Sequence, residues 1–197
     1  IGSQNDTVMV TAGRLQGQAE AVNVERMSPN IVQVETAGVI TSLPNTNVAD
    51  AVGRLPSVSL ERDEGEGKYV QIRGTEPRLS NTMVDGVTIP SPESGVRQIK
   101  LDTIASDLVD SVEINKTLQA NIDGDGIGGS VNLVTKTATD TPTIVMYGIG
   151  GYTPIVGGRK VDQFGSTMGK RFGATKKFGV LLGGTYDFNG RRINDIE

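Results

Sequence analysis

The sequence contains no cysteine, histidine or tryptophan, and only 4% of its residues are aromatic. Without cysteine and histidine, disulfides, thiolate nucleophiles and the usual zinc ligands are excluded. The absence of histidine also removes Ser-His-Asp catalysis and the usual general base near neutral pH. A pair of carboxylates for glycoside hydrolysis is compatible with the composition, but no motif marks one. The composition therefore predicts a protein that is not an enzyme and that holds no metal or other cofactor.

Clustered positive charge and long apolar runs are also missing. The net charge is −4 and no basic stripe is visible, which argues against nucleic acid as a partner. No apolar run reaches the roughly 18–20 residues that a membrane-spanning helix needs. If the chain crosses a membrane, it must therefore do so with β-strands.

Glycine is abundant, at 26 residues, which favours turns, bulges and close backbone approach over long helices. Residues 1–30 are polar and predict a mobile arm, interrupted by one strand-like run at Thr7–Thr11. We treat this arm as the first unit of the chain.

Residues 31–138 predict a second unit built from short elements. A helix is expected after an N-cap at Asn45 or Thr46, with Leu55 on its apolar face, and Pro56 should end it. Asp85-Gly86 stands between two β-prone runs and predicts a tight hairpin, because both turn residues must adopt positive φ. A charged loop at Asp63–Gly67 and a short helix near Leu108 are also expected. Strands are predicted at Ile31–Val34, Val58–Glu61, Tyr69–Arg73, Thr82–Val84, Val87–Ile89, Val112–Ile114 and Val131–Val134.

Residues 139–197 predict a third unit with three longer strands, at Ile144–Tyr152, Val161–Phe172 and Phe178–Phe188. In the last of these, large apolar side chains alternate with small or polar ones. This pattern is typical of a transmembrane barrel strand, although an amphipathic strand of a soluble sandwich gives the same alternation. Three strands cannot close a barrel, so the barrel is expected to be incomplete in this chain.

Two motifs near residue 125 suggest ligands. Gly124, Gly126 and Gly129 satisfy G-x-G-x-x-G, but a strand is predicted to follow them, where dinucleotide binding requires a helix. Asp123 and Asp125 do not have the ligand spacing of a calcium-binding EF-hand loop. We therefore interpret this segment as a tight loop that packs closely on its neighbours.

The order of several short motifs resembles the plug domain of TonB-dependent outer-membrane transporters. Each motif is weak alone, but their succession over residues 6–136 is specific. In chain order they are Asp6–Ala12, Leu55–Val58, Ile72–Gly74, Asp85–Gly86, Val112–Glu113–Ile114 and Gly128–Lys136. Lys116-Thr117-Leu118 stands where many relatives have a basic residue followed by Gly-Pro. The Asn-Ile-Asp-Gly-Asp-Gly loop resembles a branch often linked to carbohydrate uptake.

This resemblance implies the fold class and the partners. The fold would be an α+β plug domain followed by antiparallel transmembrane β-barrel strands, in the outer membrane of a Gram-negative bacterium. Outer-membrane lipid would surround the strands. A β-prone segment on an arm can add to a partner's sheet, and the family implies the C-terminal domain of TonB, driven by the ExbB–ExbD motor. The TonB-binding residues would be Asp6, Thr7, Val8, Met9, Val10, Thr11 and Ala12.

The resemblance also implies roles inside the barrel. Arg73, the arginine of the I-R-G motif, would pair with barrel carboxylates, and Lys116 would take a second such role. Loops at the extracellular end would contact a small solute, expected to be an oligosaccharide. The residues expected to face it are Arg78, Ser80, Asn81, Glu93 and Ser94.

Two other functions stay open at this stage. The first is a plug-like interaction module for signalling or adhesion, without transport. The second is a secreted hydrolase, which the missing histidine and cysteine make the weaker alternative.

Overall fold

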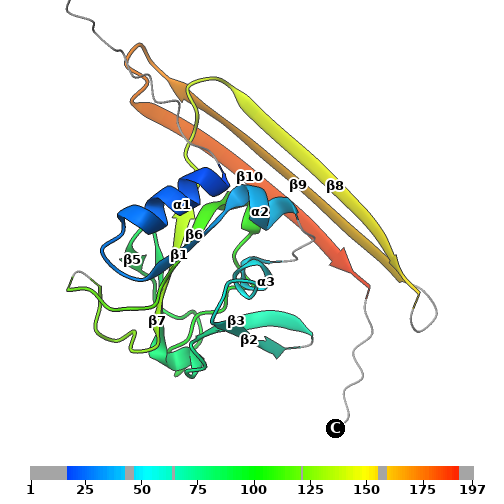
Figure 1. Cartoon of the computed structure of the whole chain (residues 1–197). Coiled ribbons are helices and arrows are strands. Elements are labelled where there is room, and N and C mark those ends of the chain that lie inside the picture. The colour runs from blue at the N-terminus through cyan, green and yellow to red at the C-terminus, as the bar shows by residue number, and fades with distance from the viewer. Residues whose placement is uncertain (1–16, 43–46, 64, 121, 155–158, 191–197) are drawn as a thin grey trace, which may run out of the picture.

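The computed structural model of the chain describes residues 17–42, 47–63, 65–120, 122–154 and 159–190. The elements fall into two groups, a mixed domain of short helices and strands and a sheet of three long strands (Figure 1). We call the first group the plug domain and the second the wall. The plug domain contains α1 (Gln18–Met27), β1 (Val32–Thr36), α2 (Ala37–Ser42), α3 (Val48–Val52), β2 (Val58–Asp63), β3 (Glu66–Ile72), the 3-10 turn η1 (Pro77–Leu79), β4 (Ser80–Val84), β5 (Val87–Thr88), the 3-10 turn η2 (Ser106–Leu108), β6 (Val109–Asn115) and β7 (Gly129–Thr135). The wall contains β8 (Thr143–Thr153), β9 (Arg159–Phe172) and β10 (Phe178–Asn189).

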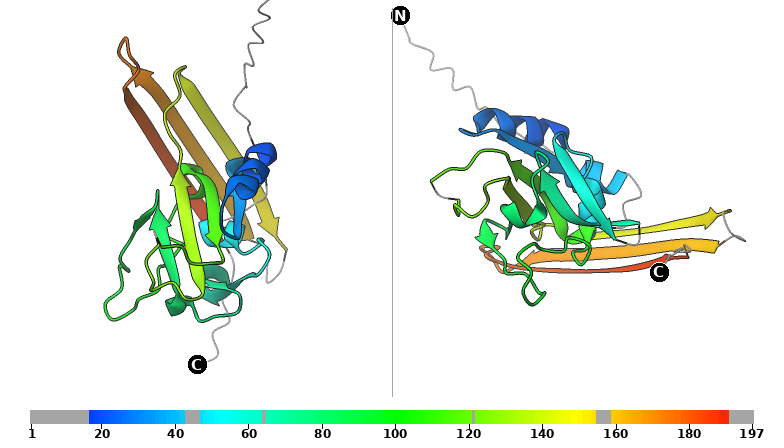
Figure 2. Two further views of the ribbon diagram at one scale, coloured as in Figure 1. Left: turned by 60° about the vertical axis from the view of Figure 1, so that its left-hand side comes forward. Right: turned by 90° about the horizontal axis from the view of Figure 1, so that it is seen from below.

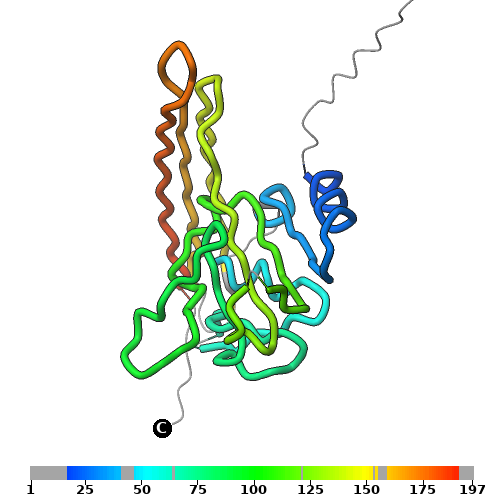
Figure 3. The backbone as a smooth tube through the Cα atoms, turned by 90° about the vertical axis from the view of Figure 1, so that its left-hand side faces the viewer, coloured from blue at the N-terminus to red at the C-terminus, as the bar shows by residue number. Residues whose placement is uncertain are grey.

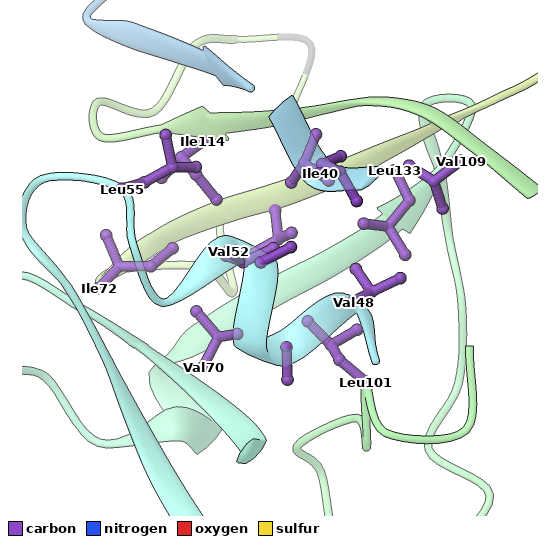
Figure 4. Packing of buried hydrophobic residues seen from close by; sticks show 14 residues of the cluster. Ile40, Val48, Val52, Leu55, Val70, Ile72, Leu101, Val109, Ile114 and Leu133 are labelled. Carbon is purple, nitrogen blue, oxygen red and sulfur yellow. The ribbon is translucent and has the colours of Figure 1, made fainter. Parts of the chain in front are cut away.

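A mixed five-stranded sheet organises the plug domain. Its order is β1-β6-β7-β4-β5, and β4 and β7 are parallel while the other pairs are antiparallel. Strands β2 and β3 form a separate hairpin. Apolar side chains from α3, β3, β6 and β7 meet between these layers (Figure 4). They form the hydrophobic core of the plug domain, whose labelled members in Figure 4 are Ile40, Val48, Val52, Leu55, Val70, Ile72, Leu101, Val109, Ile114 and Leu133.

Helix α3 begins one or two residues later than the predicted cap at Thr46 or Asn45 would place it. The N-cap is Asn47, whose Oδ1 accepts a hydrogen bond from Asp50 N at 3.0 Å. Asn47 Nδ2 also donates to Gly67 O at 3.2 Å, so the cap holds the helix on β3. Asn45 and Thr46 lie outside the described residues. Several residues near Asn47 are acceptable caps, and the contact with β3 is a tertiary feature that local sequence does not encode.

The predicted Asp-Gly hairpin is confirmed. Asp85 has φ 49° and Gly86 has φ 80°, so both turn residues take the left-handed conformation that a tight hairpin requires. The strands on either side are short, because β5 ends at Thr88. The predicted charged loop at Asp63–Gly67 is shorter than expected, because β2 extends to Asp63 and β3 begins at Glu66.

Helix α1 corrects the prediction of an irregular arm over residues 1–30. Ala21 of this helix is buried against Val32 and Val34 of β1. Glu25 Oε1 accepts a hydrogen bond from Val34 N at 2.9 Å, which satisfies a backbone donor on the edge strand of the sheet. The helix is polar by composition and is held by these contacts. The predicted TonB-binding segment, Asp6–Ala12, lies outside the described residues.

The wall is an open antiparallel sheet in the order β10-β9-β8, with the plug domain on one face (Figure 2). The predicted alternation in β10 is confirmed. Phe178, Leu182, Tyr186 and Phe188 are exposed on the outer face, away from the plug, while glycines of the inner face contact the plug domain. The alternation therefore separates a surface for apolar surroundings from a surface for the plug. Among the described residues, every helix is too short or too polar to cross a lipid bilayer.

Candidate functional site

The contact between plug and wall is centred on Asp107, in η2. Its side chain is only 4% exposed, and its Oδ2 accepts a hydrogen bond from Tyr147 Oη, in β8, at 2.8 Å. A buried carboxylate needs such a donor, because burial without a partner is costly. The bond joins two segments that lie 40 residues apart in the chain. Sequence reasoning did not identify either residue.

Glycines of the wall provide the space for this contact. Gly165 lies opposite Tyr147 in the register of β9 and β8. A Cβ atom on Gly165 would lie 2.3 Å from Tyr147 Cε1 and 2.5 Å from Asp107 Oδ2. A Cβ on Gly183, in β10, would lie 2.8 Å from Leu108 Cδ2. The inner face is therefore shaped to receive η2 because it lacks side chains at these points.

Residues 136–142 connect β7 to β8, and we call them the linker. The linker lies across the same inner face of the wall. Lys136 N donates to Leu108 O at 2.9 Å, and Arg171 N donates to Thr139 O at 2.9 Å. Ala138 is buried, and a Cβ on Gly179 would lie 3.0 Å from its methyl group. The linker thus adds to the docking contact of η2.

Arg73 and Lys116, the predicted barrel-contact residues, have their hydrogen-bond partners within the plug domain. Arg73 Nε donates to Gly128 O at 3.1 Å and Arg73 Nη2 donates to Ile127 O at 3.0 Å. Arg73 N donates to Ser57 O at 2.8 Å, and Lys116 Nζ lies 3.4 Å from Ser57 Oγ. The two residues therefore lie around Ser57, and Arg73 also contacts residues 123–129, which we call the glycine loop. Pairing with barrel carboxylates stays a prediction.

The glycine loop packs tightly, as predicted. A Cβ on Gly128 would lie 2.2 Å from Thr75 Oγ1, and one on Gly129 would lie 2.7 Å from Asn115 O. Gly129 also has φ 139°, which side chains disfavour. Strand β7 begins at Gly129, so the helix that dinucleotide binding requires is not formed at this point.

A hollow of about 490 Å³ includes in its lining Arg78, one of the five residues predicted to face the solute. Arg78 and Leu79 line one side, and Gly95, Val96, Arg97 and Gln98 line the other. Arg78 pairs with Glu76, and Arg97 pairs with Asp125 of the glycine loop. Both arginines are more than half exposed. Arg97 was not predicted, since a single arginine in a polar loop carries no local signal.

Three of the predicted solute-facing residues, Ser80, Asn81 and Glu93, are buried or partly buried, and a solute contact at each stays a prediction. Ser80 and Asn81 belong to β4 and not to a loop, and the buried Asn81 Nδ2 lies 3.3 Å from Thr88 Oγ1. Glu93 pairs with Lys100 and accepts a hydrogen bond from Tyr69 Oη at 2.7 Å. The contact with Lys100 lowers the pKa of Glu93 most, and the hydrogen bond from Tyr69 lowers it further. Arg78 and Ser94 are the predicted residues whose side chains stay exposed.

The described residues hold no group of three or more acidic side chains, histidines or cysteines close enough to bind a metal ion. Asp123 Oδ1 lies 3.4 Å from Asp125 N, within a turn, and Asp125 pairs with Arg97. The acidic pair therefore belongs to the loop structure.

Comparison with known proteins places these features in a family. Residues 24–130, more than half of the chain, match the sequence profile of the TonB-dependent Receptor Plug Domain. The chain is 32% identical over 137 residues to a vitamin B12 transporter, BtuB, of Vibrio vulnificus strain YJ016, covering 68% of this chain and 21% of that protein. It is 27% identical over 146 residues to the ferrienterobactin receptor of Escherichia coli K12, covering 68% of this chain and 19% of the receptor. The chain thus spans about a fifth of the length of these relatives.

Solved structures show the same fold. The unliganded ferric citrate transporter FecA superposes with a TM-score of 0.67 at 24% identity, covering 87% of this chain and 27% of FecA. The siderophore receptor PirA of Acinetobacter baumannii gives 0.63 at 23% identity, covering 84% and 25%. These comparisons confirm the predicted fold class, a plug domain followed by antiparallel barrel strands in a sheet that is not closed in this chain. The relatives are receptors and transporters, in agreement with the prediction of a non-enzyme. By its sequence profile and its fold, the chain belongs to the TonB-dependent receptor plug domain family, in the outer membrane of Gram-negative bacteria.

Proposed function

We propose that this chain supplies the plug and wall strands of an importer that TonB energises to take a scarce anionic solute across the outer membrane. The observation that carries the proposal is the position of the plug domain on the inner face of a sheet whose outer face is apolar and exposed (Figure 2). A plug in this position blocks the lumen that such a sheet encloses. Import then requires the plug to move or to change shape.

The contacts between plug and wall are suited to such a change. Among the described residues they include the hydrogen bond between Asp107 and Tyr147, two backbone hydrogen bonds of the linker and packing of Leu108 and Ala138 on glycines. An interface of this kind can be opened and closed again at a moderate cost in free energy.

The hollow lined by Arg78 and Arg97 supports an anion as the cargo. Arg78 and Arg97 line it with exposed guanidinium groups, which bind carboxylates and other oxyanions well. Arg78 and Leu79 of η1 line the hollow, and the chain around η1 lies at the end of the plug away from α1 (Figures 1 and 3). The relatives and solved structures are named for vitamin B12, ferric enterobactin, siderophores and ferric citrate, and none of these names supports the oligosaccharide predicted from the loop motif. A negatively charged ferric chelate fits the two arginines best.

The energy coupling is tested through the segment Asp6–Ala12. The intact protein and its Val10→Pro variant are titrated calorimetrically with a TonB C-terminal domain from the same source. We expect binding that the proline abolishes, because proline removes a backbone donor and restricts φ, whereas Val10→Ala should still bind. If neither the wild type nor the variants bind TonB, the interaction module without transport becomes the better function.

The solute class is tested by binding ferric enterobactin, ferric citrate, cyanocobalamin and a maltooligosaccharide to the intact protein. We expect a ferric chelate to bind, with an affinity that Arg78→Gln and Arg97→Gln each lower about tenfold. Arg62→Gln is the matched control, because Arg62 is also half exposed on the plug but lies outside the hollow. Binding of the sugar alone, or equal losses in all three variants, would contradict the proposal.

A further inference from the structure

A second hollow, of about 580 Å³, lies where the linker crosses the end of the wall. Its lining includes four basic side chains, Lys136, Arg171, Lys176 and Lys177, together with the hydroxyl-bearing Thr137 and Thr175. Lys176 Nζ lies 3.6 Å from Asp140 Oδ2, the one ion pair that the structure gives to these four side chains among the described residues. In a chain with a net charge of −4, this is a marked concentration of positive charge. Such a cluster is suited to an anion.

Gly179 and Leu181 place the hollow on the inner side of the wall, and its turn residues, Thr175, Lys176 and Lys177, lie between Phe172 and Phe178, at the edge of the apolar outer face. Phe172 ends β9 and Phe178 begins β10, and the two residues pair across the sheet. Both are about half exposed or more, at 49% and 67%. From Phe178 to Phe188 the apolar face of β10 spans eleven residues, a rise of about 33 Å along the strand. At the usual tilt of barrel strands this corresponds to a band roughly 25 Å tall, the thickness expected of a membrane-facing surface.

Lys170 shows where this band ends. It lies in β9, two residues before Phe172, and pairs with Val180 of β10, so it is on the outer face. Its Nζ lies 5.6 Å from the centre of the Phe172 ring. A lysine on an apolar face extends its ammonium group along the surface toward the polar boundary. Lys170, the aromatic pair and the basic hollow thus follow one another from the apolar band to the tip of the strands.

We infer that this basic hollow binds the phosphate group of an anionic phospholipid headgroup at the membrane boundary. The phosphate oxygens would accept hydrogen bonds from the ammonium and guanidinium groups, and from the hydroxyl groups of the two threonines. The acyl chains would lie along the exposed outer face beyond Phe172 and Phe178. The linker lines the hollow and also contacts η2, so a bound headgroup would strengthen the docking of the plug. This inference depends on the fold and not on the identity of the cargo.

The test uses the intact protein in a neutral detergent. It is titrated with a short-chain phosphatidylglycerol, a short-chain phosphatidylcholine or inorganic phosphate, and binding is followed by native mass spectrometry and thermal unfolding. We expect phosphatidylglycerol to bind and to raise the melting temperature, with an affinity that Lys176→Gln/Lys177→Gln lowers about tenfold or more. Lys176→Arg/Lys177→Arg keeps the charges and should retain binding. Arg159→Gln/Lys160→Gln, at the other end of β9, is the matched control and should also retain binding.

Three results would overturn the inference. Equal losses of affinity in Lys176→Gln/Lys177→Gln and in the control Arg159→Gln/Lys160→Gln would indicate unspecific attraction to positive charge. Equal binding of phosphatidylcholine would show that the net charge of the headgroup plays no part. Inorganic phosphate that binds as tightly as phosphatidylglycerol and protects the protein to the same extent would identify a site for the free ion.

Discussion

Tyr147 and Asp107 form the side-chain hydrogen bond that crosses from wall to plug, at 2.8 Å. Replacing Tyr147 with Phe removes the donor and leaves a buried carboxylate without this partner. We expect the free energy of unfolding of the plug to fall by about 1–3 kcal/mol, measured by urea denaturation of the intact protein in detergent. The double variant Tyr147→Phe/Asp107→Asn should lose little more than either single variant. Strictly additive losses would show that the two side chains do not act together.

Gly165 offers a second test at the scale of one residue. Gly165→Ala places a methyl group 2.3 Å from Tyr147 Cε1, so the ring or the plug must shift. We expect a loss of about 1–3 kcal/mol in the stability of the docked plug and faster proteolysis of the linker. Gly148→Ala is the control, because a Cβ at Gly148 meets no atom within 4 Å. Similar proteolysis rates for both variants would contradict the role assigned to Gly165.

At the scale of elements, the β4–β5 hairpin is anchored to β7 by its own turn. Asp85 Oδ1 accepts a hydrogen bond from Thr135 N at 2.8 Å, and Oδ2 accepts one from Thr135 Oγ1 at 2.6 Å. The hydrogen bond from the Thr135 hydroxyl lowers the pKa of Asp85 most, and the bond from the Thr135 backbone N–H lowers it further. A carboxylate with a lowered pKa stabilises the fold above its unfolded-state pKa of about 4, and this contribution is lost as the pH falls through the folded-state pKa.

Asp85→Asn keeps a residue that tolerates positive φ but exchanges one acceptor oxygen for a donor. We therefore expect the variant to be less stable than the wild type near pH 6, by about 1 kcal/mol or less, and the difference to shrink near pH 3. Urea unfolding at both pH values measures this. A difference that does not depend on pH would mean that the charge of Asp85 plays no part in anchoring the turn.

Elements with strong local signals were predictable, and those held by tertiary contacts were not. The Asp-Gly turn and the alternation of β10 depend on backbone preference and period, which the sequence states directly. Helix α1 was missed because its stability comes from Ala21 and Glu25 against β1. The short helix expected near Leu108 is a single 3-10 turn, since Val109 already begins β6.

For the whole molecule, the two faces of the wall should respond in opposite ways to charge. Leu182→Arg introduces a cation into the middle of the exposed apolar face and should impair membrane assembly, at a cost of about 2–4 kcal/mol. Thr185→Arg, on the inner face of the same strand, should assemble normally. Heat-modifiable mobility of the protein extracted from outer membranes distinguishes the two. Equal assembly of both variants would contradict a membrane-facing outer surface.

Of the residues predicted to face the solute, Arg78 alone lines the hollow, and its role in binding a solute stays a prediction. Glu93 and Asn81 are polar as well, but both have partners inside the plug domain. Glu93 contacts Tyr69 and Lys100, and Asn81 contacts Thr88. Sequence alone cannot distinguish a polar side chain that faces solvent from one with a partner far along the chain.

The sequence by itself determined the family, the order of most strands and the faces of β10, because motifs, turns and alternation are local properties of the chain. Only the tertiary structure decided which residues dock the plug on the wall. Asp107 has no motif around it, and its role arises from Tyr147, 40 residues away, and from the space that Gly165 leaves. Partners that are distant in sequence are selected by packing and burial, which become defined only when the chain is folded.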